Sequence, residues 1–366
     1  MFRLTALLTA LMLALTSPAL ASDFSALKAR LAGDGFGQPE VQALFDSPAV
    51  KFSPEPMGGK LLELYAKKYG SEVVRQVQAR LADLGYYFGE VTGQPDFLLR
   101  AAIRAFQTDH ALTLDTRASQ ELLALVTAES QKASPETSQR LKDLAASGPP
   151  QVYEVVLQPE RLAEAMEFFQ ANKDVLEQVR ARYGVPPEAA VGLLTVETRV
   201  GKYLGDNLAL ANLASMCAGG DFSRVEGMFA GENLSPERRA WLAAKAGEKA
   251  AWAYTELKAL LTYARQNNLD LTKMPGSIYG AIGISQFMPS SVLKWGVGGP
   301  DGRVDLFRVP DALFSMANFL RAHGFTGNLS DEDTLRQALY RYNHSEAYVN
   351  TIMAVCHYLH GQPAKP

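Results

Sequence analysis

The chain has 366 residues, of which 47% are hydrophobic and 20% charged, a composition typical of a globular protein with two or more folding units. Its formal net charge is −3 at pH 7. Because nucleic-acid-binding proteins usually carry a basic surface, this mildly acidic chain is expected to have no nucleic-acid partner.

The first 21 residues have the pattern of a secretory signal peptide. They run from a positive charge at Arg3 through a short apolar stretch to the small-residue sequence ending at Ala21. This order predicts cleavage after Ala21. The apolar stretch is too short to span a bilayer, and no cysteine stands at the cleavage point. We therefore expect residues 1–21 to be removed and the exported protein to be soluble, with no membrane span or lipid anchor.

Helices are expected along most of the remaining chain. Residues 22–69 are predicted to form short helices broken by the stretches GDGFG and SPEPMGG. Residues 70–127 form a compact unit, whose first two helices are predicted by apolar residues at helical spacing: Val74, Val77, Leu81 and Leu84 in one, Ile103 and Phe106 in the other. A third short helix is expected after Asp115. Residues 128–150 are polar, small and proline-rich, which predicts a linker.

The last segment, residues 151–366, is also predicted to be mainly helical. An amphipathic helix is expected from Pro159 and a second one from Pro187, followed by one or two alanine-rich helices over 237–267. A glycine-rich turn region then spans 275–302, and two more helices are expected to close the chain. The sequence VYEVVL at 152–157 is the only clear strand candidate.

One acidic residue, Glu197, lies in the middle of an apolar helical run. Leu193, Leu194, Val200 and Gly201 lie one turn to either side of it, so the carboxyl group is expected on the apolar face. Such a residue can be a catalytic acid. The alternative is a buried structural acid that pairs with Arg199 or Lys202.

Three separated motifs together suggest a family. They are VETRVGKYLG around Glu197, GSIYGAIGISQFMPSS at 276–291 and RYNHSEAY at 341–348. In this order and spacing they resemble the lytic murein transglycosylases of the B type, which have a lysozyme-like domain. The resemblance covers roughly residues 152–360, with a weaker echo in 24–69. Separately, LGYYFG and AAIRAFQ make residues 71–127 similar to a three-helix peptidoglycan-binding module.

The resemblance implies a fold class and a set of site residues. The fold would be mainly α, with a lysozyme-like catalytic domain that has little sheet and a small three-helix peptidoglycan-binding-like domain. Residues 22–69 would pack on the catalytic domain of 151–366. The implied catalytic residue is Glu197, and the implied substrate-binding residues are Ser277, Gln286, Tyr342 and Asn343, with the aromatic residues Tyr279 and Phe287 as candidates for stacking on sugars.

Each of these substrate-binding residues also has a structural interpretation. Ser277 and Gln286 could satisfy backbone groups in a glycine-rich turn. Tyr342 and Asn343 could brace a helix start. For any one of the aromatic side chains, packing in the core is at least as common as contact with a ligand.

The residue types are consistent with cleavage of a glycosidic bond. This reaction needs a carboxylic acid that stays protonated near neutral pH, and burial raises a carboxyl pKa. Ordinary glycosidases use a second carboxylate, but neither 276–291 nor 341–345 contains one. That absence favours a mechanism in which the sugar's own acetamido and 6-hydroxyl groups act as nucleophiles, giving 1,6-anhydro-N-acetylmuramic acid. The alternatives are a hydrolytic muramidase of the same fold and a non-catalytic peptidoglycan-binding protein.

No cofactor is expected, and the proposed partner is the glycan strand of peptidoglycan, which places the exported protein in the periplasm, as a monomer. No metal site is expected either, because the loop WGVGGPDGRVDLFRVPD lacks oxygen ligands at its early positions. The two cysteines, Cys217 and Cys356, could form a disulfide in an oxidising compartment or remain two buried thiols.

Overall fold

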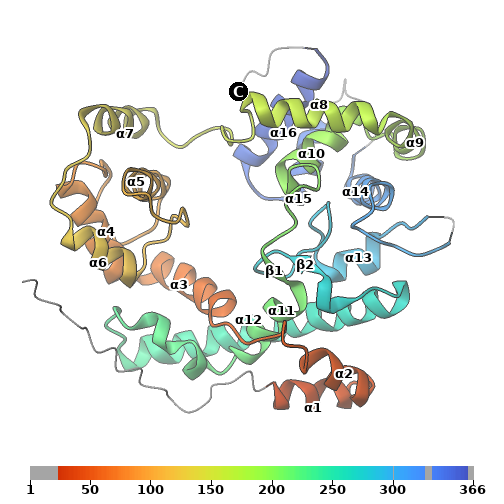
Figure 1. Cartoon of the computed structure of the whole chain (residues 1–366), viewed down its shortest axis with the longest axis horizontal. Coiled ribbons are helices and arrows are strands. Elements are labelled where there is room, and N and C mark those ends of the chain that lie inside the picture. Colours follow the sequence, from red (N-terminus) through yellow and green to blue (C-terminus); the bar gives the residue numbers. More distant parts are fainter. Residues whose placement is uncertain (1–23, 300, 326–331, 362–366) are drawn as a thin grey trace, which may run out of the picture.

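The computed structural model describes residues 24–299, 301–325 and 332–361 (Figure 1). The proposed signal peptide, residues 1–21, lies outside these ranges. The described chain is mainly helical, so the predicted mainly α fold class is confirmed. Its sheet consists of two antiparallel two-residue strands, β1 (Asn207–Leu208) and β2 (Pro275–Gly276), in which Asn207 pairs with Gly276. No helix in the described ranges combines the length and apolarity needed to cross a bilayer.

The first three helices pack against a much later part of the chain. Their bounds are α1 (Ser25–Gly33), α2 (Gln38–Phe45) and α3 (Glu55–Tyr69). Buried residues of these helices, Leu31 and Leu61 among them, share one hydrophobic core with residues between 209 and 306. The elements of that later part are α11 (Ala209–Ala218), the 3-10 helices Phe222–Arg224, Glu226–Phe229 and Leu271–Lys273, α12 (Pro236–Asn267) and α13 (Pro289–Trp295). We call this body the lower lobe.

A second core is built by the remaining helices of the C-terminal half. They are α8 (Pro159–Ala171), α9 (Lys173–Tyr183), α10 (Pro187–Thr198), α14 (Val309–Ala322), α15 (Glu332–Tyr342) and α16 (Glu346–Leu359). Their buried residues form one cluster, which we call the upper lobe. Figure 1 shows these helices above the lower lobe, with the short sheet lying between the two bodies.

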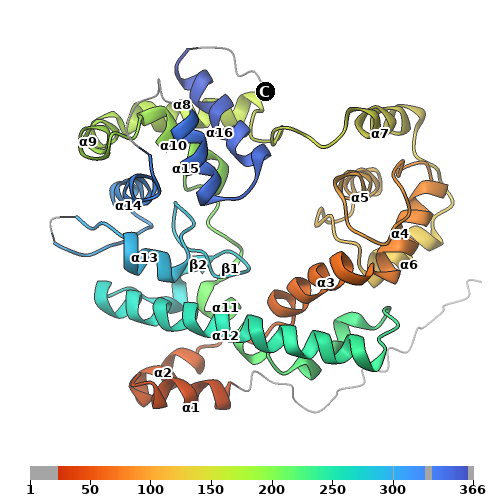
Figure 2. The ribbon, with the colours of Figure 1, turned by 180° about the vertical axis from the view of Figure 1, so that it is seen from behind.

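The unit at 70–127 has its own core. It contains α4 (Glu72–Asp83), α5 (Phe97–Asp109) and α6 (Gln120–Ala128), and Figure 2 shows it from behind, beside the other two bodies. Local signals explain the first two helices. Ser71 and Asp96 accept hydrogen bonds from backbone N–H groups in the first turns of α4 and α5. The chain leaves α4 through Gly85, whose φ of 83° suits glycine.

The segment 128–150, for which the composition predicted a linker, contains a helix. It contains α7 (Pro135–Ser147), which begins with Ser134 as its cap and a proline in the first turn. The helix packs back on the preceding unit through buried Leu141, and the hydroxyl of Ser138 donates to the carbonyl of Gly85 at 2.8 Å. A small apolar face therefore orders a segment that is otherwise polar.

The strand candidate at 152–157 was wrong, because the structure has turns there. Val152 and Val156 are buried while Val155 is exposed. A strand that buries residues 152 and 156 would also bury the residue between them on the same face, but Glu154 is exposed. The backbone N–H of Tyr153 donates to the hydroxyl of Thr351 on α16 at 2.7 Å rather than to a neighbouring strand.

The cysteines do not form the disulfide that the sequence allowed. Both are free thiols. Cys217 packs against the lower-lobe core and Cys356 lies inside the upper-lobe core. Burial raises the pKa of the Cys217 thiol to about 12 and raises that of Cys356 further, so both remain protonated at neutral pH.

A buried glutamate joins the unit of α4–α6 to the lower lobe. Glu232, 8% exposed, accepts hydrogen bonds from the hydroxyl of Ser71 and, at 2.9 Å, from the backbone N–H of Glu72. Both donors belong to the start of α4, where a negative charge is favoured by the helix dipole. An exposed ion pair between Arg117 and Glu55 adds a second contact. The unit is thus held at a defined place.

Replacing Glu232 with alanine is expected to weaken this junction. The substitution leaves the Ser71 hydroxyl and a first-turn N–H without their acceptor, which costs about 1–3 kcal/mol. Chemical denaturation should show a corresponding fall in the free energy of unfolding. Asn233→Ala, at the exposed neighbouring position, is the matched control and should be near neutral; an equal loss in the two variants would contradict the assigned role of Glu232.

Candidate active site

Glu197 lies in the last turn of α10, at the face between the two lobes. Pro187 occupies the first turn of this helix, and the helix ends at Thr198 because Arg199 and Val200 adopt φ values of 53° and 50°. Val200 and Gly201, which were expected one helical turn beyond Glu197, therefore lie outside the helix. A left-handed conformation is rare for a β-branched residue such as valine. This sharp end leaves the Glu197 carboxyl at the edge of the upper-lobe core.

Three hydrogen bonds connect the three sequence motifs. The hydroxyl of Thr198 donates to the carbonyl of Ile284 at 2.7 Å, which joins the first motif to the second. The hydroxyl of Tyr342 donates to the carbonyl of Ser285 at 2.5 Å, which joins the third motif to the second. The hydroxyl of Tyr348 donates to Oε1 of Glu197 at 2.5 Å, which joins the third motif to the first. Segments far apart in the sequence thus meet around one carboxyl group.

The environment of Glu197 favours its protonated form. Burial raises the pKa of the carboxyl group from 4.5 to about 7, although the hydrogen bond from Tyr348 acts in the opposite direction. Burial also raises the pKa values of the Tyr342 and Tyr348 hydroxyls well above their usual range, and the nearby Glu197 adds to this effect. Both tyrosines therefore stay neutral, and Glu197 titrates near neutral pH, where a general acid is most effective.

The alternative in which Glu197 pairs with a neighbouring cation is wrong. Arg199 binds Glu160 at 2.5 Å and Glu164 at 2.5 Å, and Lys202 binds Glu164 at 2.9 Å. Both acids lie on α8. These contacts lower the pKa of Glu164 to about 2. The two cations of the first motif therefore form ion pairs that hold the turn after α10 against α8. The Glu197 carboxyl is hydrogen-bonded by Tyr348 instead.

Ser277 and Gln286 lie in the turns that follow β2, and both are half-buried. The hydroxyl oxygen of Ser277 accepts from the backbone N–H of Ala281 at 3.0 Å. Gln286 has a φ of 49°, and its side-chain amide donates to the carbonyl of Gly283 at 3.0 Å. Both side chains thus form hydrogen bonds with backbone groups of the glycine-rich turn, as the structural alternative predicted. A serine hydroxyl and a glutamine amide each retain further hydrogen-bonding capacity.

The remaining predicted site residues occupy different environments. Tyr342 packs against the cores of both lobes, and Asn343 is exposed at the end of α15. The side-chain cap of α16 is Ser345, whose backbone N–H donates to the carbonyl of Asn343 at 2.8 Å. Tyr279 is half-buried on the lower lobe. Phe287, at 3% exposure, belongs to the core and packs on Tyr342 with ring centroids 5.9 Å apart, so its ring is not available to stack on a sugar.

Two functional candidates were missed by reasoning from the sequence. Tyr348 is 1% exposed and is the residue that contacts the Glu197 carboxyl. Thr198 holds the second motif through Ile284. Both residues lie inside the quoted motifs, and only their hydroxyl groups marked them in the sequence as possible hydrogen-bond donors. Their partners lie 151 and 86 residues away along the chain, which no local pattern reveals.

The carboxylates of the loop after α13 and of the first turn of α14 accept hydrogen bonds from nearby backbone N–H groups. Buried Asp311 accepts from the N–H of Asp305 at 2.8 Å, and Asp305 accepts from the N–H of Phe307 at 3.0 Å. Asp301 accepts from the N–H of Arg303 at 3.2 Å. Within the described ranges, His, Cys, Asp and Glu side chains do not gather in groups of three or more that could hold a metal ion.

Comparison with known protein families assigns the chain. The family described as "Transglycosylase SLT domain" matches residues 101–332, more than half of the chain, and the chain belongs to this family. The match includes Glu197, Ser277 and Gln286 and ends before Tyr342. The family described as "Putative peptidoglycan binding domain" matches residues 70–126. The resemblances seen in the motifs are thereby confirmed.

The chain is also similar to individual proteins. Membrane-bound lytic murein transglycosylase B of Escherichia coli is 32% identical over 168 residues, which are 46% of this chain and 39% of that protein. The chain thus spans well under half of this curated relative. Among solved structures, Escherichia coli lytic transglycosylase SLT35 in complex with calcium has a TM-score of 0.47 and 21% identity, covering 70% of this chain and 91% of that one. SltB3 of Pseudomonas aeruginosa, in complex with NAG-anhNAM-pentapeptide, has a TM-score of 0.46 and 19% identity, covering 58% and 66%.

Proposed function

We propose that the protein is a peptidoglycan lytic transglycosylase that cleaves the β-1,4 bond between N-acetylmuramic acid and N-acetylglucosamine. The observation that carries the proposal is the Glu197 carboxyl, whose pKa is raised to about 7 by burial where the three motifs meet. Membership of the transglycosylase family and the match of residues 70–126 to a peptidoglycan-binding family support the choice of substrate.

In the proposed mechanism, one carboxyl group serves both half-reactions. Protonated Glu197 donates its proton to the glycosidic oxygen as the bond from that oxygen to carbon 1 breaks. The acetamido oxygen of the same N-acetylmuramic acid bonds to carbon 1 and stabilises the positive charge. The sugar's 6-hydroxyl then attacks carbon 1, displacing the acetamido oxygen, and gives its proton to Glu197. The product is a 1,6-anhydro sugar, and no water is consumed.

The other site residues fit distinct roles in this proposal. Ser277 and Gln286 would present their remaining hydrogen-bonding capacity to the sugar from turns of the lower lobe. Asn343, exposed at the end of α15, would bind it from the upper lobe. Phe287 would support Tyr342 rather than touch the substrate, and Tyr279 would offer its half-exposed ring. The unit of α4–α6, fixed by Glu232, would hold the cell wall at a set distance from the site.

Tyr348 would tune the acidity of Glu197. Its hydroxyl donates to the carboxylate form, so this contact lowers the pKa of the carboxyl group. In Tyr348→Phe the pKa of Glu197 is expected to rise above about 7, and the fall in kcat/KM at high pH should move to higher pH. Tyr153→Phe, which removes the hydroxyl that contacts Ser345 at 3.2 Å, is the matched control. An unshifted profile in Tyr348→Phe would contradict the assigned contact.

Release of soluble fragments from purified sacculi tests the enzymatic function. We expect steady release of many more fragments than there are protein molecules, because each enzyme molecule turns over many times. A protein that only binds peptidoglycan would sediment with the sacculi and release nothing. A hydrolytic muramidase would release fragments too, and the chemistry of the new ends separates it from a transglycosylase.

A further inference from the structure

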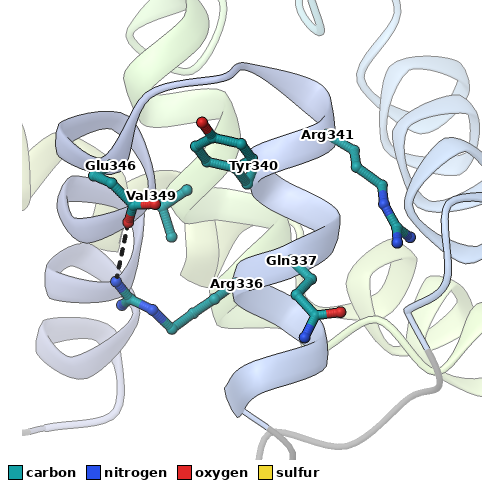
Figure 3. Close-up of a pocket in the computed structure, with 6 residues that line it drawn as sticks. All are labelled: Arg336, Gln337, Tyr340, Arg341, Glu346 and Val349. Carbon is teal, nitrogen blue, oxygen red and sulfur yellow. Dashed lines mark ion pairs between the residues drawn. The ribbon is translucent and has the colours of Figure 1, made fainter.

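A groove of about 290 Å³ lies between α15 and α16 (Figure 3), and its charged groups already have partners. The guanidinium of Arg336 lies 3.9 Å from the carboxylate of Glu346 and donates to the side chain of Asn350 at 2.5 Å. Arg341 lies on the other side of α15, where it donates to the backbone carbonyl of His323. The groove therefore has no net charge to attract an ionic ligand. A buried polar contact in the lower lobe bears more directly on the reaction.

That contact is made by Asn212, which lies on α11 and is only 4% exposed. Its side-chain Nδ2 donates to the backbone carbonyl of Ser277 at 2.9 Å. The neighbouring Leu210 and Leu213 are fully buried in the lower-lobe core. Burial of an amide is unfavourable unless it is hydrogen-bonded, so the bond to Ser277 is what accommodates Asn212 in this core. Asn212 belongs to none of the three motifs, although its partner does.

The turn that Asn212 contacts, residues 277–281, presents the Ser277 hydroxyl. The backbone N–H of Ser277 donates to the carbonyl of Ala281 at 2.8 Å, and the N–H of Gly280 donates to the carbonyl of Ser277 at 2.8 Å. The N–H of Ala281 donates to the hydroxyl oxygen of Ser277 at 3.0 Å. Because that oxygen already accepts a hydrogen bond, the hydroxyl retains its own proton as a donor for the sugar.

The turn lies directly on α11. The strand β1 runs into α11, and β2 ends one residue before Ser277, so the short sheet fixes both segments at their starts. A Cβ atom at Gly276 would lie 2.8 Å from that of Ala209, and one at Gly280 would lie 2.5 Å from the side chain of Leu213. Only glycine permits so close an approach. The buried amide is thus a polar link across a tight contact between the turn and the helix.

We propose that Asn212 is a positioning residue that orients the Ser277 hydroxyl toward the sugar. This inference rests on the proposed function, because it takes Ser277 as a contact of the glycan strand. The carbonyl of Ser277 accepts from both Gly280 and Asn212, so loss of the amide leaves the turn closed but allows it to tilt on α11. The hydroxyl then spends less time in the orientation that binds the sugar. Asn212 is buried and acts only through Ser277.

A double-mutant cycle on Asn212 and Ser277 tests the proposal. Asn212→Leu removes the donor at similar volume, and Ser277→Ala removes the hydroxyl. On soluble glycan strands we expect each single variant to raise KM about three- to tenfold, the effect of one neutral hydrogen bond, with kcat nearly unchanged because the contact is uniform binding. The double variant should have the KM of Ser277→Ala alone, since residues that act through one contact are not additive.

Asn172→Leu is the matched control for this cycle. Its side-chain amide also donates to a backbone carbonyl, that of Phe168 at 2.8 Å, but at the end of α8. Its KM should equal that of the wild type. Asn212→Ala, which places a good helix former in α11, is the second variant and should raise KM in the same way. Unchanged KM in the folded Asn212 variants, a loss in kcat alone, or additive effects in the double variant would overturn the proposal.

Hydrogen exchange of the substrate-free protein, followed by mass spectrometry, tests the contact independently of turnover. In Asn212→Leu the fragment covering 276–286 should exchange about threefold faster or more, while fragments of α16 keep their wild-type rates. Equal acceleration of both regions, or none in 276–286, would overturn the positioning role even in an active enzyme. A wild-type protein that releases nothing from sacculi would instead reject the proposed function, and with it the sugar contact, whatever the exchange rates are.

Discussion

Glu197→Gln is expected to abolish turnover of peptidoglycan while the protein remains folded. Glutamine keeps the size of the side chain and can still accept the hydrogen bond from Tyr348, but it has no proton to transfer. General acid–base catalysis contributes about 10²–10⁴-fold to a rate, and the loss should be at least that large because Glu197 serves both half-reactions. Binding to sacculi should persist, since the other site residues and the α4–α6 unit are unchanged.

The matched control is Glu188→Gln on the same helix. Glu188 contacts His360 on the molecular surface at 3.2 Å and has no proposed part in the reaction. Fragment release from sacculi by the three proteins, with circular dichroism to establish folding, makes the comparison. Near-normal release by folded Glu197→Gln would reject Glu197 as the acid.

The same substitution is expected to stabilise the protein at alkaline pH. The pKa of Glu197 is about 7 in the folded protein against 4.5 for the unfolded chain, so the folded state binds the proton more tightly. The free energy of unfolding of the wild type therefore falls as the pH rises from 4.5 to about 7 and stays lower above it. A shift of this size corresponds to about 3 kcal/mol. A glutamine does not titrate and avoids that loss.

Denaturant titrations at pH 4 and pH 8 measure this effect. At pH 4 Glu197 is protonated in both folded and unfolded chains, so the titration contributes no difference between the proteins there. At pH 8 the Glu197→Gln variant should be the more stable by about 3 kcal/mol. The same difference at both pH values would show that packing rather than titration is responsible. Ionisation of Glu197 in the folded protein would then not lower the free energy of unfolding, contrary to a raised pKa.

The features that local patterns control could be predicted from the sequence. Periodic apolar residues such as Val77 and Leu81 predicted α4, and the proline at 187 predicted the start of α10. The three motifs identified the family, and they made Glu197 the candidate acid because such motifs combine a chemical group with the turn that presents it. The sequence could not exclude an ion pair between Glu197 and Arg199, because the two residues are only two positions apart.

The features that the sequence did not reveal depend on contacts between distant segments. The hydroxyl of Tyr348 reaches Glu197 only because α16 packs on α10, and Arg199 turns away because α8 offers two carboxylates. Helix α7 forms on a polar segment because Leu141 finds a place in the neighbouring core. The end of α10 at Thr198 likewise requires left-handed backbone at Val200, against the preference of valine.

The central claim is that the 6-hydroxyl of N-acetylmuramic acid, rather than water, attacks carbon 1 in the second half-reaction. Digestion of purified sacculi in water enriched with oxygen-18, followed by mass spectrometry of the new ends, tests it directly. The account predicts 1,6-anhydro-N-acetylmuramic acid ends without oxygen-18, produced by the wild type and not by Glu197→Gln. Reducing N-acetylmuramic acid ends that carry oxygen-18 at carbon 1 would contradict the account and make the protein a hydrolase.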